Sequence, residues 1–107
     1  MPAELDDGEL VINGTGNLHD YCRVTVTQDL STIVVKQATR NSDGGAYVAE
    51  PTQTFAAKDV KRIIYNALGG NNFFGCFTRL LPNVDVIYMG GDGRNDYVGV
   101  KNVTMLP

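Results

Sequence analysis

TFAAKDVKRIIYNAL, residues 54–68, is the stretch that decides the fold that this sequence predicts. Its apolar side chains recur at three- and four-residue spacing and its charged side chains occupy the opposite face, which is the pattern of an amphipathic helix. Thr54 is a suitable N-cap and Gly69 a suitable C′ residue, so both ends carry helix-boundary signals. The sequence therefore predicts one helix over residues 54–68, with Ile63 and Ile64 both buried.

Strand patterns and glycine-marked turns surround this helix. Cys22, Val24 and Val26 alternate with polar residues, and residues 32–38 form a β-branched run, so this part predicts a hairpin that turns at residues 29–31. Further strands are predicted at residues 46–49, 73–80, 84–89, 96–100 and 103–106. A lone helix needs an apolar surface to lie on, and the flanking strands supply one. The predicted fold class is α+β, a single amphipathic helix packed on one face of an antiparallel or mixed β-sheet.

Length and charge predict one domain preceded by an acidic segment. The chain has 107 residues, which fits one domain and is too short for two. Residues 1–20 contain acidic side chains and no Lys or Arg, so we expect a solvated acidic N-terminal segment at 1–20 and a single α+β domain at 21–107. The Gly-Gly pairs at 44–45, 69–70 and 90–91 separate dissimilar segments of unequal length, which argues against an internal repeat.

The two cysteines bear on the compartment of the protein. Cys22 and Cys76 form neither a metal-binding motif nor a C-x-x-C pair. We predict a disulfide between them, with two buried thiols as the alternative. Together with glycosylation sequons at 13–15 and 102–104, the disulfide favours a secreted protein, with a cytoplasmic one as the alternative. The longest uncharged stretch, residues 63–78, is interrupted by Gly and Asn, so no membrane span is expected.

Two residues are candidates for catalysis. His19 is the only histidine, and a histidine acts as a general base when a carboxylate orients it. Its neighbour Asp20 points to the opposite face of a strand, so a surface histidine is the alternative. Asp85 interrupts the apolar strand at 84–89, but it shares a face with Ile87, which makes it a solvent-facing side chain where the strand begins. No cofactor motif accompanies these residues, and we expect no cofactor.

The segment GGDGRNDYV, residues 90–98, resembles a single calcium-binding nonapeptide of the parallel β-roll type, G-G-x-G-x-D-x-U-x. Asn95 stands where that family has an aspartate. The family holds each ion between stacked copies of the repeat, and this sequence contains one copy. We therefore expect a tight turn between two strands and no metal; the ligands of a calcium ion here would be Asp92, Asn95 and Asp96.

Two groups of residues are candidates for binding a partner. Lys58, Lys61 and Arg62 form a basic patch on the predicted helix, and Phe73 and Phe74 place aromatic mass directly after a glycine-rich connection. The alternatives are a solvated helix face and a strand that packs in the core. Consecutive residues of a strand point to opposite faces, so we expect one of the two phenylalanines to be exposed. The net charge of −3 argues against nucleic acid as a partner.

Together these patterns predict a small non-enzymatic protein-binding domain of the inhibitor, effector or toxin-partner kind, which binds another protein or a second copy of itself. One alternative is a small hydrolase such as a nuclease, which would use His19 with an arginine and a carboxylate such as Glu50 or Asp85. Another is a self-assembling subunit with exposed strand edges. A cleft that gathers the polar residues favours the enzyme, whereas an aromatic surface or a symmetric edge favours binding or assembly.

Overall fold

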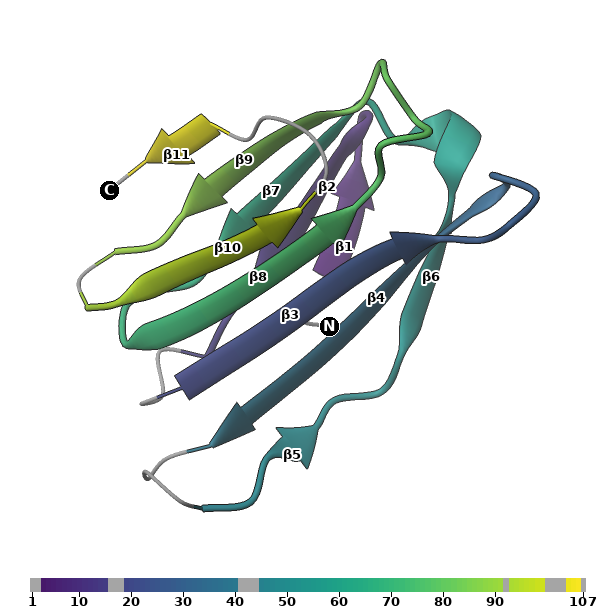
Figure 1. Ribbon diagram of the computed structural model, residues 1–107. Helices are drawn as coiled ribbons and strands as arrows, with labels where there is room; N and C mark the ends of the chain where they lie inside the picture. Colours follow the sequence, from purple (N-terminus) through teal and green to yellow (C-terminus); the bar gives the residue numbers. More distant parts are fainter. Residues whose placement is uncertain (1–2, 16–18, 41–44, 92, 100–103, 107) are drawn as a thin grey trace.

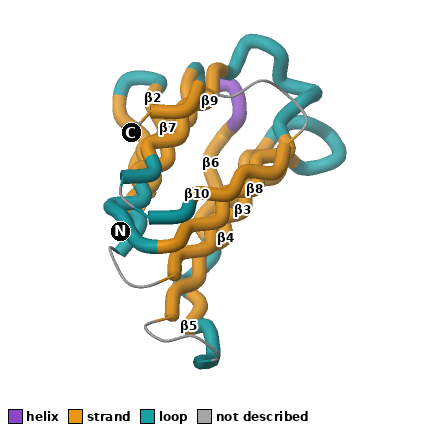
Figure 2. Tube along the Cα trace, turned by 60° about the vertical axis from the view of Figure 1, so that its left-hand side comes forward, coloured by secondary structure: helices purple, strands orange, loops and turns teal. Residues whose placement is uncertain are grey.

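The protein is all-β, and in this computed structural model two mixed sheets pack face to face (Figure 1). The structure describes residues 3–15, 19–40, 45–91, 93–99 and 104–106. Figure 2 shows the sheets as separate layers, with a 3₁₀ turn near one end. Within the described residues this turn, Ala57–Asp59, is the only helical element, so none of them forms a helix that could cross a membrane.

Sheet A and sheet B each combine parallel and antiparallel pairs. Sheet A has the strand order β1-β2-β7-β9-β11, in which β1 is antiparallel to β2 and the later neighbours are parallel. Its strands are β1 (Ala3–Asp6), β2 (Glu9–Asn13), β7 (Arg62–Asn66), β9 (Asp85–Met89) and β11 (Thr104–Leu106). Sheet B has the order β10-β8-β3-β4-β5, and β6 also pairs with β4. Its strands are β3 (His19–Val26), β4 (Thr32–Arg40), β5 (Val48–Ala49), β6 (Gln53–Ala56), β8 (Asn71–Phe77) and β10 (Asn95–Gly99).

Strand–turn–strand coils are stacked on one another through most of the molecule. Each coil runs along sheet A, turns, and returns along sheet B: β2 leads to β3, β7 to β8 and β9 to β10 (Figure 1). Equivalent residues of the coils lie side by side, for example Asp20, Asn72 and Asn95 where the strands of sheet B begin. The coils share a backbone path while their turns differ in length and sequence, which is why the sequence gives no sign of a repeat.

The predicted helix is wrong, and with it the α+β fold class. Residues 54–68 contribute most of β6, the 3₁₀ turn and all of β7. Ile63 and Tyr65 are fully buried while Ile64 is partly exposed, which is the alternation of a strand and contradicts the expectation that both isoleucines are buried. The apolar residues in this stretch fit the spacing of a helix and also the alternation of a strand. The pairing of β7 with β2 and β9 decides in favour of the strand.

The predicted helix boundaries have other roles. Thr54 is an exposed residue of β6 and caps nothing. Leu68 and Gly69 have φ values of 63° and 90°, so the backbone between β7 and β8 enters the left-handed region that glycine tolerates best. The glycine that suggested the end of a helix therefore marks a turn from one sheet to the other.

Most of the predicted strands are confirmed. β3 and β4 form the expected antiparallel hairpin, and Thr27 N donates to Thr32 O at 2.9 Å across its turn. Hydrogen bonds from Thr27 Oγ1, and from the hydroxyl and N–H of Ser31, lower the pKa of the Asp29 carboxyl to about 2 and fix this turn. The strands β5, β8, β9, β10 and β11 overlap the ranges expected from the sequence.

A single core lies between the sheets. Phe74 of β8 stands at its centre, with ring centroids 4.9 Å from Tyr65 and 5.3 Å from Tyr88. The segment at residues 1–20 supplies β1 and β2 to sheet A, and Leu10 and Ile12 of β2 are fully buried. The other fully buried apolar side chains among the described residues are Cys22, Val24, Ile33, Val35, Ile63, Ala67 and Cys76. The described residues thus form one all-β domain.

The predicted disulfide is wrong. Cys22 and Cys76 are both fully buried in sheet B as thiols, with no bond between them. Cys22 is paired with Phe74 in the parallel register of β3 and β8, and Cys76 with Val24, so the two cysteines occupy diagonal positions. Diagonal Cβ atoms on neighbouring strands are roughly 7–8 Å apart, whereas a disulfide needs about 3.5–4.5 Å. The expectation of a secreted protein loses this support.

We expect both thiols to be unreactive in the folded protein. Burial, together with the nearby Cys76 and Asp20, raises the pKa of the Cys22 thiol well above its usual value, so the nucleophilic thiolate is scarce. Titration with an aromatic disulfide reagent should give no reaction in native buffer and two thiols per chain after denaturation. Rapid reaction of either thiol in the native state would contradict the packing of sheet B.

Candidate functional site

The outward-facing side chains of β3, β4, β8 and β10 form the outer face of sheet B. Successive residues of a strand point to opposite sides of the sheet. The residues that precede and follow the core residues Cys22, Val24 and Phe74 in the sequence therefore point toward solvent. The charged and aromatic members of this face are His19, Tyr21, Arg23, Lys36, Arg40, Phe73, Phe77 and Asp96. They are partly or fully exposed, whereas most of the side chains that alternate with them in β3, β4 and β8 are buried.

An aromatic row crosses the middle of this outer face. Tyr21 of β3 and Phe73 of β8 are opposite each other in register, with ring centroids 5.2 Å apart and ring planes inclined by 5°. Tyr47 meets Tyr21 edge to face, at 6.4 Å between centroids. Because the Tyr21–Phe73 spacing is close to the roughly 4.8 Å between strands, the two rings stand on edge, with their flat faces against each other.

Three cationic side chains border the aromatic row. Arg23 lies over the ring of Phe77 with Cζ 5.4 Å from the centroid, and Lys36 is its partner across β3 and β4. Arg40 lies over Tyr47 with Cζ 4.8 Å from the centroid. Within the described part of the chain, none of the three is paired with a carboxylate. The outer face of sheet B is therefore positive, although the whole chain carries a net charge of −3.

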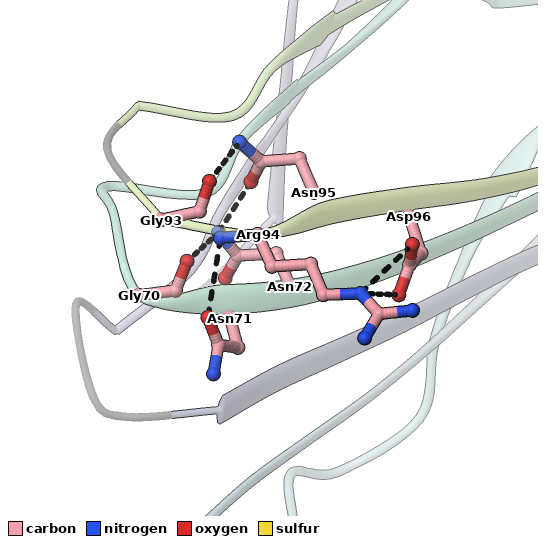
Figure 3. A network of polar contacts seen from close by, with 7 residues as sticks. All are labelled: Gly70, Asn71, Asn72, Gly93, Arg94, Asn95 and Asp96. Atoms are coloured by element: carbon pink, nitrogen blue, oxygen red, sulfur yellow. Dashed lines mark hydrogen bonds and ion pairs between the residues drawn. The ribbon is translucent and has the colours of Figure 1, made fainter.

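A hollow of about 330 Å³ lies where this face meets the turns of the coils. Its outward-facing lining residues are His19, Tyr47, Asn71, Phe73, Arg94 and Asp96. Arg94 Nε binds Asp96 Oδ2 at 3.1 Å, and the Arg94 N–H donates to Asn71 Oδ1 at 3.1 Å (Figure 3). Asp96 is thus neutralised by Arg94, and it is the only carboxylate among the outward-facing residues of these four strands.

The buried side chain of Asn72 and the partly exposed one of Asn95 hold the stacked turns together beneath this hollow. Asn72 Nδ2 donates to the Gly70 carbonyl at 3.1 Å and to Asn95 Oδ1 at 2.9 Å (Figure 3). It also donates to the Gly90 carbonyl at 3.3 Å. A Cβ on Gly93 would clash with the carbonyl oxygen of Gly70, so the close approach of the turns also requires glycine. Asn72 was not singled out from the sequence, although the run Gly-Gly-Asn-Asn at residues 69–72, which leads into β8, was the available signal.

The segment that resembles a calcium-binding nonapeptide connects the two sheets. The described residues of this segment, 90–91 and 93–94, lie between β9 of sheet A and β10 of sheet B and against the turn before β8, so the segment connects strands of different sheets. Asn95 Nδ2 donates to the carbonyls of Gly91 at 3.1 Å and Gly93 at 3.4 Å. An amide group thereby occupies acceptors that a cation would need. Asp96 is bound to Arg94, and Asp92 lies outside the described residues.

We expect calcium to leave the stability of the protein unchanged. The carbonyls of Gly91 and Gly93 are already bound by Asn95, so an ion would have to displace these hydrogen bonds. Thermal melts in millimolar calcium and in chelator should coincide. A midpoint several degrees higher in calcium, lost in the Asp92→Ala variant, would show a site at this turn.

The remaining sequence candidates lie elsewhere. Asp85 is exposed at the start of β9, as its place in the strand predicted, and lines a different hollow from His19. Lys58 and Lys61 are exposed beside the 3₁₀ turn, and Arg62 binds Glu9 Oε2 at 3.1 Å. The basic patch proposed from the helix therefore has no helix to carry it, and it does not share a hollow with Phe73.

Residues that are adjacent in the sequence lie on opposite faces of sheet B. Asp20 is buried and accepts from Thr15 N at 3.1 Å and Thr15 Oγ1 at 2.8 Å, whereas His19 faces outward, as the alternation predicted. Phe74 is in the core, and Phe73 is partly exposed on the outer face of sheet B. Tyr21, Arg23 and Arg40 were not singled out from the sequence, because only the pairing of β3 with β4 and β8 brings them beside Phe73.

The fold and the site define an all-β domain of stacked coils with a positive, aromatic outer face. Comparison with protein-family models, with curated proteins and with solved structures finds no match to this chain.

Proposed function

We propose that the protein is a non-enzymatic binding domain, of the inhibitor or effector kind, that recognises an acidic surface of another protein through the outer face of sheet B. The observation that supports this most strongly is the aromatic row of Tyr21 and Phe73, bordered by three cations that lack a carboxylate partner within the described residues. Aromatic and arginine side chains are the usual centres of binding energy at protein interfaces. A positive surface on an otherwise acidic chain also favours encounter with an acidic partner.

The geometry of the rings favours a protein over a nucleic acid. A base binds by stacking on an open aromatic face. Here Tyr21 and Phe73 cover one face of each other, Arg23 lies on Phe77, and Arg40 lies on Tyr47. The groups that remain exposed to a partner are ring edges, which can contact apolar side chains, and guanidinium groups, which can bind carboxylates.

Charge reversal on the outer face of sheet B tests this proposal. Poly-L-glutamate serves as the probe for an acidic polypeptide, and its affinity is measured by fluorescence anisotropy. The double variant Arg23→Glu and Lys36→Glu should bind at least about tenfold more weakly, a loss of about 1.4 kcal/mol or more.

The matched control makes the same charge change elsewhere. Lys58→Glu with Lys61→Glu alters two exposed lysines beside the 3₁₀ turn, and binding of poly-L-glutamate should stay within about twofold. If both double variants bound poly-L-glutamate equally weakly, the binding would depend on the net charge of the protein and not on the outer face of sheet B. Tighter binding of a single-stranded oligonucleotide than of poly-L-glutamate would replace the protein partner with a nucleic acid.

A hydrolase is the second candidate, because the hollow brings His19 to the same surface as Arg94 and Asp96. Glu50 and Asp85, the carboxylates considered from the sequence, do not line this hollow. The His19→Ala variant is the test, assayed with nucleic acid and ester substrates. Loss of a measurable activity in a folded variant would favour the hydrolase, whereas binding of poly-L-glutamate unchanged in His19→Ala supports the binding domain.

A further inference from the structure

The two ends of the stack of coils differ. At one end, β1 adds to β2 in the antiparallel sense, and β4 adds to β3 with β5 and β6 beyond it. This end terminates in strands that are not part of any coil, with β1 at the edge of sheet A and β5 at the edge of sheet B. At the other end, the edge strands are β10 of sheet B and β11 of sheet A, both parallel to their neighbours (Figure 1). Edge strands of this kind present hydrogen-bonding groups to another strand.

This second end has the shape of a step. β9 and β10 belong to the same coil, and β11 adds one further strand to sheet A only. Within the described residues, no strand lies beside β10 on its outer edge. Sheet A is therefore longer than sheet B at this end by one strand, which corresponds to about 4.8 Å.

Such a step is complementary to itself under one particular two-fold rotation. The strands of the coils run in opposite directions in the two sheets, as the arrows of β9 and β10 show (Figure 1). A two-fold axis parallel to the strands places sheet A of a second copy on sheet B of the first. The long side of each copy then meets the short side of the other, and the touching strands are antiparallel. A two-fold axis perpendicular to both sheets would instead join β11 to β11 and leave a gap between the two β10 strands.

We infer that the β10–β11 end binds a second copy of this chain, with β10 of each copy paired antiparallel to β11 of the other. Both sheets then continue across the interface, and the hydrogen-bonding edge of β10 is covered. Val98, which is 48% exposed in the single chain, gains a neighbouring strand on the same outer face. The interface is isologous and uses the β10–β11 end of both copies, so assembly through this end stops at a dimer. The inference uses a different part of the molecule from the proposed recognition face and does not depend on it.

Cross-linking between single-cysteine variants tests the arrangement. Val98 and Thr104 are exposed and point outward from sheets B and A, and the two-fold axis brings these surfaces together. We mix Val98→Cys with Thr104→Cys and, to allow for register, Asp96→Cys with Thr104→Cys, and add a short bismaleimide. Cross-linked dimer should form in at least one mixture and be absent from each variant alone, since the native cysteines are buried.

Sedimentation equilibrium gives the independent measurement. The unmodified chain should be dimeric at micromolar concentration, and Val98→Lys should weaken the dimer at least about tenfold because a charged side chain on an edge strand opposes pairing. Val48→Lys, at an exposed residue of β5 at the opposite edge of sheet B, is the matched control and should leave the dimer unchanged. A monomer at all concentrations, or cross-linking of Val98→Cys with itself alone, would overturn the inference.

Discussion

Replacing Phe74 by alanine is expected to lower the free energy of unfolding by about 3–5 kcal/mol. The ring is fully buried and contacts Tyr65, Tyr88 and Tyr97, with centroid distances of 4.9, 5.3 and 5.8 Å. Its removal would leave a cavity between the sheets that strands of stacked coils cannot close. Urea denaturation followed by circular dichroism measures the loss.

The neighbouring phenylalanine provides the control. Phe73 is partly exposed and contacts Tyr21 on the outer face, so Phe73→Ala should cost only about 1 kcal/mol. The same variant should weaken binding of poly-L-glutamate, since it removes the ring that stacks on Tyr21 in the aromatic row. Equal destabilisation by the two substitutions would contradict the assignment of one ring to the core and the other to the outer face of sheet B.

Replacing Asn72 by alanine is expected to cost about 2–4 kcal/mol, because buried polar groups would lose their hydrogen-bond donor. The Gly70 carbonyl and Asn95 Oδ1 accept from Asn72 Nδ2, and the side chain is 3% exposed. Asn72→Asp should lower the free energy of unfolding at least as much, since a carboxylate has no proton to donate and its charge would be buried. Thermal and urea unfolding measure both variants.

Asn71 is the matched control for this position. It is exposed and adjacent, and within the described residues its one side-chain hydrogen bond is the one that Oδ1 accepts from Arg94 N. Asn71→Ala should therefore cost about 1 kcal/mol or less. If Asn72→Ala were no more harmful than Asn71→Ala, the asparagines would not be what holds the turns of neighbouring coils together.

Most strands of this protein could be predicted from the sequence, whereas the one predicted helix does not form. Alternation in β3, β4 and β9 reflects burial of one face, and it is visible in the residues themselves. Residues 54–68 carry a helical spacing and a strand spacing at once, and the choice is made by β2 and β9, which are distant in the sequence. The parallel order of the coils has no local signal, because it depends on which strands pair after each turn.

The candidate site was predicted only in part. Phe73 and His19 were recognised as single residues, and both lie at the outer face of sheet B. Arg23, Lys36 and Arg40 are scattered in the sequence and become one positive surface only through the register of β3 with β4. The basic patch of Lys58, Lys61 and Arg62 depended on a helix that does not form. Lys58 lies on the 3₁₀ turn, Arg62 begins β7, and Lys61 lies between these two elements.

Mapping the binding of poly-L-glutamate by NMR tests most directly the claim that the outer face of sheet B is the recognition surface. Backbone amide shifts are followed in an isotope-labelled sample during titration. The expected result is a set of perturbations confined to β3, β4, β8 and β10, with the largest ones near Tyr21, Arg23 and Phe73. Perturbations centred on Lys58 and Lys61, or spread evenly over both sheets, would contradict this account.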